Sequence, residues 1–190
     1  ATAQTPDGGD VNLEINSDFP LSGKIAVRVT PQKSEKFSIR LRIPSWSKET
    51  ILKVNGETVQ ALAGTYADIN RKWISEDQIE LLLDMRCHVM DAPKGSNRKG
   101  DHFQALVVGP VVLSRDENID PDFDKPVTLI SKDGYVDVKS ERPILETTKM
   151  QFLVPTADGI IHMTDYASVD SWKGKKICTW IHATLGFRLS

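Results

Sequence analysis

The sequence predicts an all-β protein, built as a jelly-roll-like antiparallel β-sandwich in one unit or in two packed β units. Apolar and polar residues alternate in several short runs, which is the period of a strand with one buried face. Gly, Pro, Asn and Asp separate these runs, as expected of turns between strands. No long segment has helical period, and strands do not alternate with helices, which argues against a parallel sheet.

The first half of the chain contains four alternating runs, at residues 11–15, 25–29, 39–43 and 79–89. Pro44 cannot donate to a β-ladder, so it ends the third run. Leu52 and Val54 then lead into Asn55-Gly56, the dipeptide best suited to a tight hairpin because both residues tolerate a positive φ. The fourth run places six apolar residues on one face of a single expected strand.

In the second half, residues 103–113 are apolar on both faces, which predicts a central strand interrupted at Gly109-Pro110. Later strands are expected at 127–130, 150–154, 160–166 and 176–183. The polar residues 91–101, rich in Gly, Pro and Lys, predict a linker or a long loop. The expected organisation is therefore a β-sandwich at 1–90 and, at 102–190, a second β unit or the remaining strands of the same sandwich.

Composition limits the classes of partner. The chain of 190 residues carries 24 basic and 26 acidic residues, a net charge of -2, so no binding to nucleic acid or to an anionic membrane is expected. No apolar run approaches the ~20 residues that a membrane-spanning helix needs. Residues 1–10 lack the basic and apolar regions of a signal peptide, and the first residue is Ala1, which indicates a mature or excised fragment.

Metal and cofactor sites are not expected. Asp116, Asn118 and Asp120 alternate like the first half of an EF-hand loop, but Pro121 and Val127 stand where that loop requires Gly and Glu. The interpretation is a solvated loop. The four histidines fall on separate strands without a shared ligand spacing: His88, His102, His162 and His182.

No nucleophile or carboxylate pair can be assigned from the sequence. Cys87 and Cys178 are most simply small buried hydrophobes, and a disulfide between them is left open. Glu80 and Asp84 share one face of an expected strand, but a glycosidase needs two carboxyl groups at a defined separation, which a sequence does not show. The two acids receive no catalytic role.

Aromatic residues are the remaining functional candidates, because sugar rings pack on flat side chains. Trp172 lies in a polar loop and, with Tyr66, is the candidate for carbohydrate binding. Trp46 and Trp73 close strand-like runs and are interpreted as plugs at strand ends, with the stems of Arg42 and Arg71 covering the rings. The expected structural residues are Pro44, Trp46, Asn55, Gly56, Arg71, Trp73, Gly109 and Pro110.

Four segments follow one another in a distinctive order: LRIPSW (41–46), KVNGETV (53–59), GTYADINRKW (64–73) and DQIELLLDM (77–85). NSDFP (16–20) precedes them and ALVVGPVVLSRDE (105–117) follows. The pattern resembles the C-terminal β-sandwich region that follows the catalytic barrel in the β-L-arabinofuranosidase-like proteins of glycoside hydrolase family 127. The resemblance covers residues 10–117 and is weaker from 118 to 190.

The resemblance implies an (α/α)-barrel, N-terminal to Ala1, that carries a cysteine nucleophile, an acid/base glutamate and a zinc cluster. Cys87 and Cys178 match none of the barrel's cysteine motifs, so no catalytic residue and no cofactor is expected in this chain. The implied role is a non-catalytic accessory sandwich that packs on its own barrel or mediates homodimerisation. The family also implies a periplasmic or secreted bacterial protein that acts on plant-type glycans.

Two alternatives stay open. A carbohydrate-binding module would present coplanar exposed aromatics in a groove, whereas an autonomous enzyme would need a deep pocket with perturbed carboxylates. An accessory sandwich would instead leave a contiguous apolar patch exposed.

Overall fold

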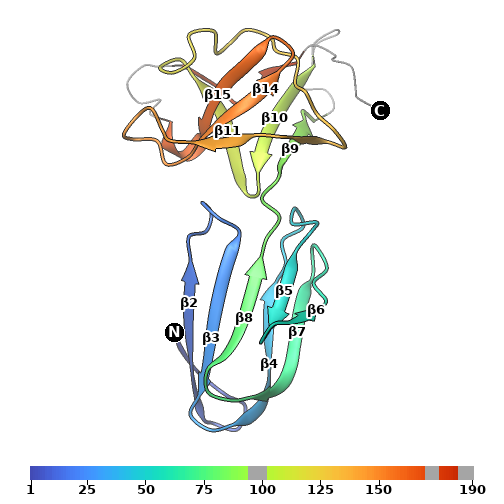
Figure 1. Ribbon diagram of the computed structural model, residues 1–190, viewed down its shortest axis with the longest axis vertical. Coiled ribbons are helices and arrows are strands. Elements are labelled where there is room, and N and C mark those ends of the chain that lie inside the picture. Colours follow the sequence, from blue (N-terminus) through green and yellow to red (C-terminus); the bar gives the residue numbers. More distant parts are fainter. Residues whose placement is uncertain (94–101, 170–175, 184–190) are drawn as a thin grey trace. The chain divides into compact units, whose positions relative to one another are not determined.

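The computed structural model describes residues 1–93, 102–169 and 176–183 (Figure 1). Nearly all regular structure is antiparallel strand, with one 3-10 turn, η1 (Tyr166–Ser168), and no α-helix in these ranges, as the alternating runs predict. The chain divides into two compact units, Ala1–Met85 and Arg86–Ser190. The division falls shortly before the expected boundary at residue 90. In the described ranges, no helix is long and apolar enough to cross a membrane.

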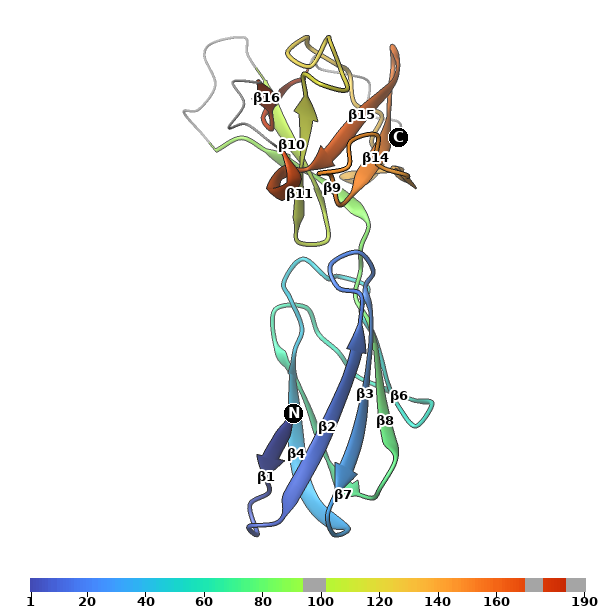
Figure 2. The same cartoon turned by 90° about the vertical axis from the view of Figure 1, so that its left-hand side faces the viewer.

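The first unit contains two sheets (Figures 1 and 2). The larger has the strand order β1-β2-β3-β8-β5-β6, with β1 (Thr2–Gln4), β2 (Asp10–Ser17), β3 (Lys24–Pro31), β8 (Asp77–Leu82), β5 (Ile51–Val54) and β6 (Glu57–Val59). The smaller pairs β4 (Glu35–Arg42) with β7 (Tyr66–Trp73) over their full length.

The core of the first unit combines residues of both sheets, which makes the unit a sandwich. Val29, Leu52 and Ile79 come from the larger sheet, while Phe37 and Trp73 come from the smaller one. On β7 and β8 every second residue is exposed, because successive side chains of a strand point to opposite faces. The alternation in the sequence therefore marks the buried face correctly.

The hairpin between β5 and β6 turns at Asn55-Gly56, as predicted. Both residues have positive φ values, 51° and 83°, as a two-residue hairpin with the favoured twist requires. The Asn55 side chain also bonds the neighbouring strand, because its Nδ2 donates to Asp77 Oδ1 at 2.8 Å and its Oδ1 accepts from the Gln78 N–H at 2.8 Å. The turn residue thus joins the hairpin to β8.

The second unit forms one sheet with the order β12-β9-β10-β11-β15-β14-β13. Its strands are β9 (Cys87–Asp91), β10 (Phe103–Val108), β11 (Val111–Asp116), β12 (Tyr135–Val136), β13 (Lys139–Glu141), β14 (Gln151–Thr156) and β15 (Gly159–Asp165). The short strands β16 (Ile177–Cys178) and β17 (Ile181–His182) pair with β11 and β10. Residues 127–130 make only isolated bridges instead of the expected strand.

The expected single strand at 79–89 is wrong. β8 ends at Leu82 and β9 begins at Cys87, in the other unit. Leu83 lies beyond the strand but donates its N–H to Gly23 O at 2.9 Å and stays buried. The alternation continues across the break because it records which residues are buried, and an unbroken ladder is not required for that.

The doubly apolar segment is buried on both faces, as expected, since Ala105 to Val108 are all buried. It forms two antiparallel strands, β10 and β11, with Val108 opposite Val111. Gly109, with a φ of 55°, and Pro110 make the turn between them. The interruption predicted at these two residues is therefore a hairpin.

Candidate functional site

Tyr66 is the predicted sugar-binding aromatic that lies within the described residues; Trp172 falls outside them. The Tyr66 side chain begins β7 and is 57% exposed. The guanidinium carbons of Arg40 and Arg42 lie 5.3 and 5.5 Å from its ring centroid. Arg42 is the direct cross-strand partner of Tyr66, and it donates to Thr65 O at 2.9 Å. Tyr66 therefore sits in a cationic cluster rather than on an aromatic platform.

Trp73 has the geometry of the predicted plug. It is fully buried, its Nε1 donates to Phe37 O at 2.9 Å, and its ring centroid lies 5.9 Å from that of Phe37. The Arg71 guanidinium carbon lies 5.4 Å from the Trp73 centroid, as expected. Trp46, in contrast, is half-buried at the border of the core. The expected cover of Trp46 by Arg42 is wrong, because Arg42 points to the solvent face of β4 and lies over Tyr66.

The two cysteines are free thiols on different strands. Burial raises the pKa of Cys87 to about 12, with a small opposing effect from a backbone hydrogen bond to Val107. Burial also raises the pKa of Cys178, which lies beside Arg115 in the sheet. Because the thiolate is the reactive form of cysteine, neither environment favours a nucleophile.

Cys87 is expected to resist alkylation in the folded protein. At pH 8 a thiol with a pKa of about 12 is ionised in only about one molecule in ten thousand, and the thiolate fraction rises only as the pH approaches that pKa. Iodoacetamide labelling, followed by peptide mass spectrometry, should be over about 100-fold slower at Cys87 in the native chain than in urea. Equal labelling rates in the two conditions would contradict the buried environment.

The acidic loop after β11 is organised around a buried cation. Arg115 is 2% exposed; its Nε donates to Asp120 Oδ2 at 2.7 Å, while its terminal nitrogens donate to Asp122 O and Lys125 O, both at 2.6 Å. Asp116 is also buried, and its Oδ1 accepts two 2.8 Å bonds from Asn118. The prediction that this loop is solvated is therefore wrong for Asp116 and Asp120, whose side chains are largely buried.

The EF-hand-like residues do not converge on one point. The Asp120 carboxylate binds Arg115, and the Asp116 carboxylate caps its own turn through Asn118. In the ranges that the structure describes, no group of three or more His, Cys, Asp or Glu residues is placed to hold a metal ion. His162 and His102 instead face single carboxylates, with Nδ1 of His162 at 2.6 Å from Glu141 and Nε2 of His102 at 3.5 Å from Asp91.

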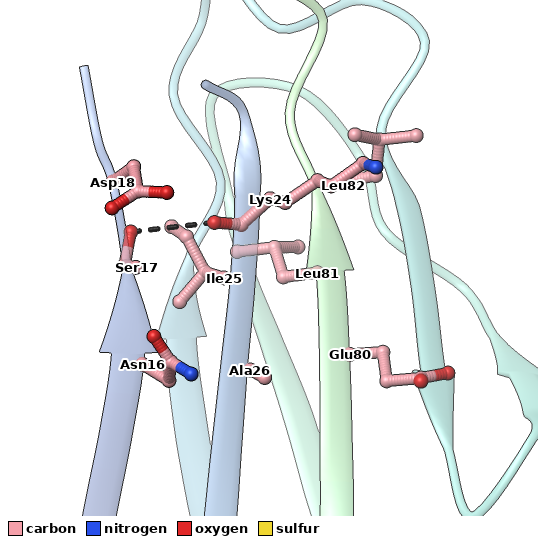
Figure 3. A pocket seen from close by; sticks show the side chains of 9 residues that line it. All are labelled: Asn16, Ser17, Asp18, Lys24, Ile25, Ala26, Glu80, Leu81 and Leu82. Atoms are coloured by element: carbon pink, nitrogen blue, oxygen red, sulfur yellow. Dashed lines mark hydrogen bonds between the residues drawn. The ribbon is translucent and has the colours of Figure 1, made fainter. Parts of the chain in front are cut away.

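A hollow of about 370 Å³ lies on the larger sheet of the first unit, across the ends of β2, β3 and β8 (Figure 3). Its size is near the lower limit for small-molecule sites. Asp18 and Glu80 line it from the end of β2 and from β8, with β3 between them, so they do not flank a common point (Figure 3). Asp84 lies beyond the end of β8 and donates its N–H to Ser47 Oγ at 2.8 Å. The acids Glu80 and Asp84 are therefore not neighbours on one strand.

Residues 1–85, the whole first unit, match the family model described as "Beta-L-arabinofuranosidase, GH127 middle domain". The first unit is therefore similar to this GH127 domain. The family model calls the matched region a middle domain, so the match supports the expected family resemblance and does not test the expected C-terminal placement.

Solved structures match nearly the whole chain. A glycoside hydrolase has 23% identity and a TM-score of 0.76, over 96% of this chain and 34% of that one. A GH127 β-L-arabinofuranosidase from Geobacillus stearothermophilus T6 has 19% identity and a TM-score of 0.75, over 97% and 32%. A GH127 β-arabinofuranosidase has 22% identity and a TM-score of 0.74, over 97% and 33%. The chain thus spans about a third of the length of these proteins, and no curated protein matches it.

Proposed function

We propose that this chain is a non-catalytic accessory β-sandwich region of a β-L-arabinofuranosidase-like glycoside hydrolase. The match of the first unit to the GH127 middle domain is the observation that carries this proposal. The two cysteines support it, because burial raises the pKa of both thiols and so disfavours a cysteine nucleophile among them. The catalytic groups would then belong to another part of the parent protein.

An exposed apolar segment supports a packing role. Ile15, Phe19 and Leu21 are 62, 43 and 62% exposed, and we call them the β2-end apolar residues. Ile15 lies on the same side of β2 as Val11, but Val11 is buried and Ile15 is exposed. Less of the protein surrounds Ile15, because the pairing of β1 with β2 ends at Asn12 and the smaller sheet has only two strands. All three lie within residues 15–21, and exposed apolar residues that form a patch are typical of surfaces that another domain covers.

The proposed partner is a catalytic barrel of the same parent protein, or a second copy of this chain in a homodimer. Family resemblance further suggests plant-type glycans as the parent's substrates and a periplasmic or secreted bacterial location. A carbohydrate-binding module is the second candidate, because Tyr66 is exposed at one end of the β4–β7 strand pair.

The chain is expected to show no hydrolysis of 4-nitrophenyl β-L-arabinofuranoside or of arabinan above the buffer rate, measured by nitrophenolate release and by reducing ends. Turnover that disappears in Cys87→Ser or Glu80→Gln would overturn the accessory role. Calorimetric titration with neutral arabinan oligosaccharides addresses the second candidate, for which Tyr66→Ala should abolish binding and leave the melting temperature nearly unchanged.

A further inference from the structure

The solvent-facing side of the β4–β7 pair carries concentrated positive charge. Every second residue of both strands points outward and is exposed, and we call this set the β4–β7 outer face: Lys36, Ser38, Arg40, Arg42, Tyr66, Asp68, Asn70 and Lys72. It holds four cations and one anion, a net charge of +3, although the chain as a whole has a net charge of -2. The positive charge is therefore a local feature of this face.

Pairing across the two strands leaves most of this charge uncompensated. Lys36 lies directly opposite Lys72, an arrangement that destabilises a sheet because like charges face each other. On this face, within the described residues, the single ion pair joins Arg40 to Asp68 at 3.9 Å. A lysine pair opposed in this way is difficult to explain by folding stability alone.

The outer face of the larger sheet shows the contrast. There Arg28 lies 3.9 Å from Glu14 and 3.4 Å from Glu76, and Lys53 stands opposite Glu80 in register. These two cations have acidic neighbours, as is common on solvated sheet surfaces. The same domain thus compensates charge on one outer face and accumulates positive charge on the other.

Tyr66 holds the two arginines in place. Both guanidinium groups lie over its ring, and Arg42 is held further by the carbonyls of Ile43 and Thr65. One terminal nitrogen of Arg42 makes both bonds, so the rest of its guanidinium can bind another acceptor. A guanidinium with restricted motion loses less entropy when it binds a carboxylate with two parallel hydrogen bonds.

We propose that the β4–β7 outer face binds an acidic polysaccharide, a polymer of uronic acid residues. Lys36, Lys72 and the arginines would bind its carboxylates, and Tyr66 offers exposed ring surface for a sugar. Along β4, the distance from Lys36 to Arg42 is about 20 Å at about 3.4 Å per residue, long enough for several sugar units. The proposal does not depend on the parent's catalytic activity, because it rests on the charge of this face.

Nucleic acid fits the same observations less well. Duplex DNA carries one charge per about 1.7 Å, whereas a uronate polymer carries one charge per sugar, so a chain of net charge -2 repels the duplex more strongly. Single-stranded nucleic acid is usually held by several stacking aromatics, and this face offers Tyr66 alone.

The test measures binding of the whole chain to polygalacturonate by isothermal titration at low and moderate salt. Lys36→Ser combined with Lys72→Ser should lower the affinity at least about tenfold, since two charge-assisted contacts are lost. The matched control, Lys24→Ser with Lys53→Ser, removes the same charge from the other outer face and should change the affinity less than about twofold. Tyr66→Ala should weaken binding several-fold, and circular dichroism should show that all variants are folded.

Four outcomes would overturn the proposal: no binding of polygalacturonate, an equal loss in the control variant, equal affinity for neutral arabinan, or tighter binding of poly(dT) than of polygalacturonate. The second would indicate a general charge effect, the third an uncharged sugar platform and the fourth a nucleic-acid surface. The first, second and fourth outcomes do not decide whether the chain is an accessory region, since that proposal is tested by hydrolysis, whereas the third would favour the carbohydrate-binding module.

Discussion

Trp73→Ala is expected to lower the free energy of unfolding of the first unit by about 3–5 kcal/mol, the usual cost of deleting a large buried aromatic. The Trp73 side chain is fully buried, so its removal leaves a cavity in the core between the two sheets. The change also leaves Phe37 O without the donor that Nε1 provides at 2.9 Å. Urea denaturation, combined with hydrogen exchange resolved by peptide, should place the loss within residues 1–85.

Tyr66→Ala is the matched control for Trp73→Ala, because the two aromatics lie on the same strand but Tyr66 is 57% exposed. Its cost should stay below about 1 kcal/mol, as is usual for surface positions. Trp73→Phe should have an intermediate effect, since it keeps most of the ring volume but removes the N–H donor. A cost below about 1 kcal/mol for Trp73→Ala would show that Trp73 is not a core residue. Trp46→Ala should cost less than Trp73→Ala, because Trp46 is only half-buried.

Arg115→Met is expected to cost about 3–5 kcal/mol in the second unit, because removing one partner of a buried ion pair leaves the other without compensation. The substitution leaves Asp120 without its 2.7 Å partner and the carbonyls of Asp122 and Lys125 without donors. Exchange protection should therefore fall in residues 113–125. Asp120→Asn, which leaves the guanidinium buried without its anion, should also destabilise this loop.

Arg28→Met tests whether the effect depends on burial, because it makes the same chemical change at an arginine whose side chain is 47% exposed. Pairs on the surface contribute roughly 0–1 kcal/mol, so a small effect is expected. If Arg115→Met and Arg28→Met had equal, small effects, the loop would not depend on the buried cation.

Because the chain has two compact units, the unfolding transition of each unit should be analysed by itself rather than as one two-state process.

The local pattern predicted much of the fold. Alternation marked the buried faces of β3, β4 and β8, and Asn55-Gly56 marked its hairpin because few other residues accept two positive φ values. The order of the RIPSW, VNGE and RKW segments identified the type of domain that the family model later matched at residues 1–85. The break between β8 and β9 was not visible, since burial keeps the same alternation on both sides of it.

The candidate sites were less accessible from the sequence. Arg115 was an ordinary charged residue beside an acidic loop, and nothing in the order of residues showed that its side chain would be buried among Asp120 and two carbonyls. The exposure of Tyr66 was anticipated, but its arginine neighbours belong to β4, a strand distant in the chain. A better signal would have been the regular spacing of Lys36, Arg40 and Arg42 on one side of a predicted strand.

The sequence by itself determined the strand faces and the tight turn, because these depend on side-chain period and on backbone conformations that only a few residues accept. The type of domain was indicated only by the resemblance of its motifs to those of a known family. The tertiary structure alone decided which strands pair and in which register. That register places Lys36 opposite Lys72 and Arg42 opposite Tyr66. It also buries Arg115 in a loop that supplies its own acceptors. Such juxtapositions join residues distant in the chain, and their energies depend on burial and on separation in space, quantities that only the folded chain defines.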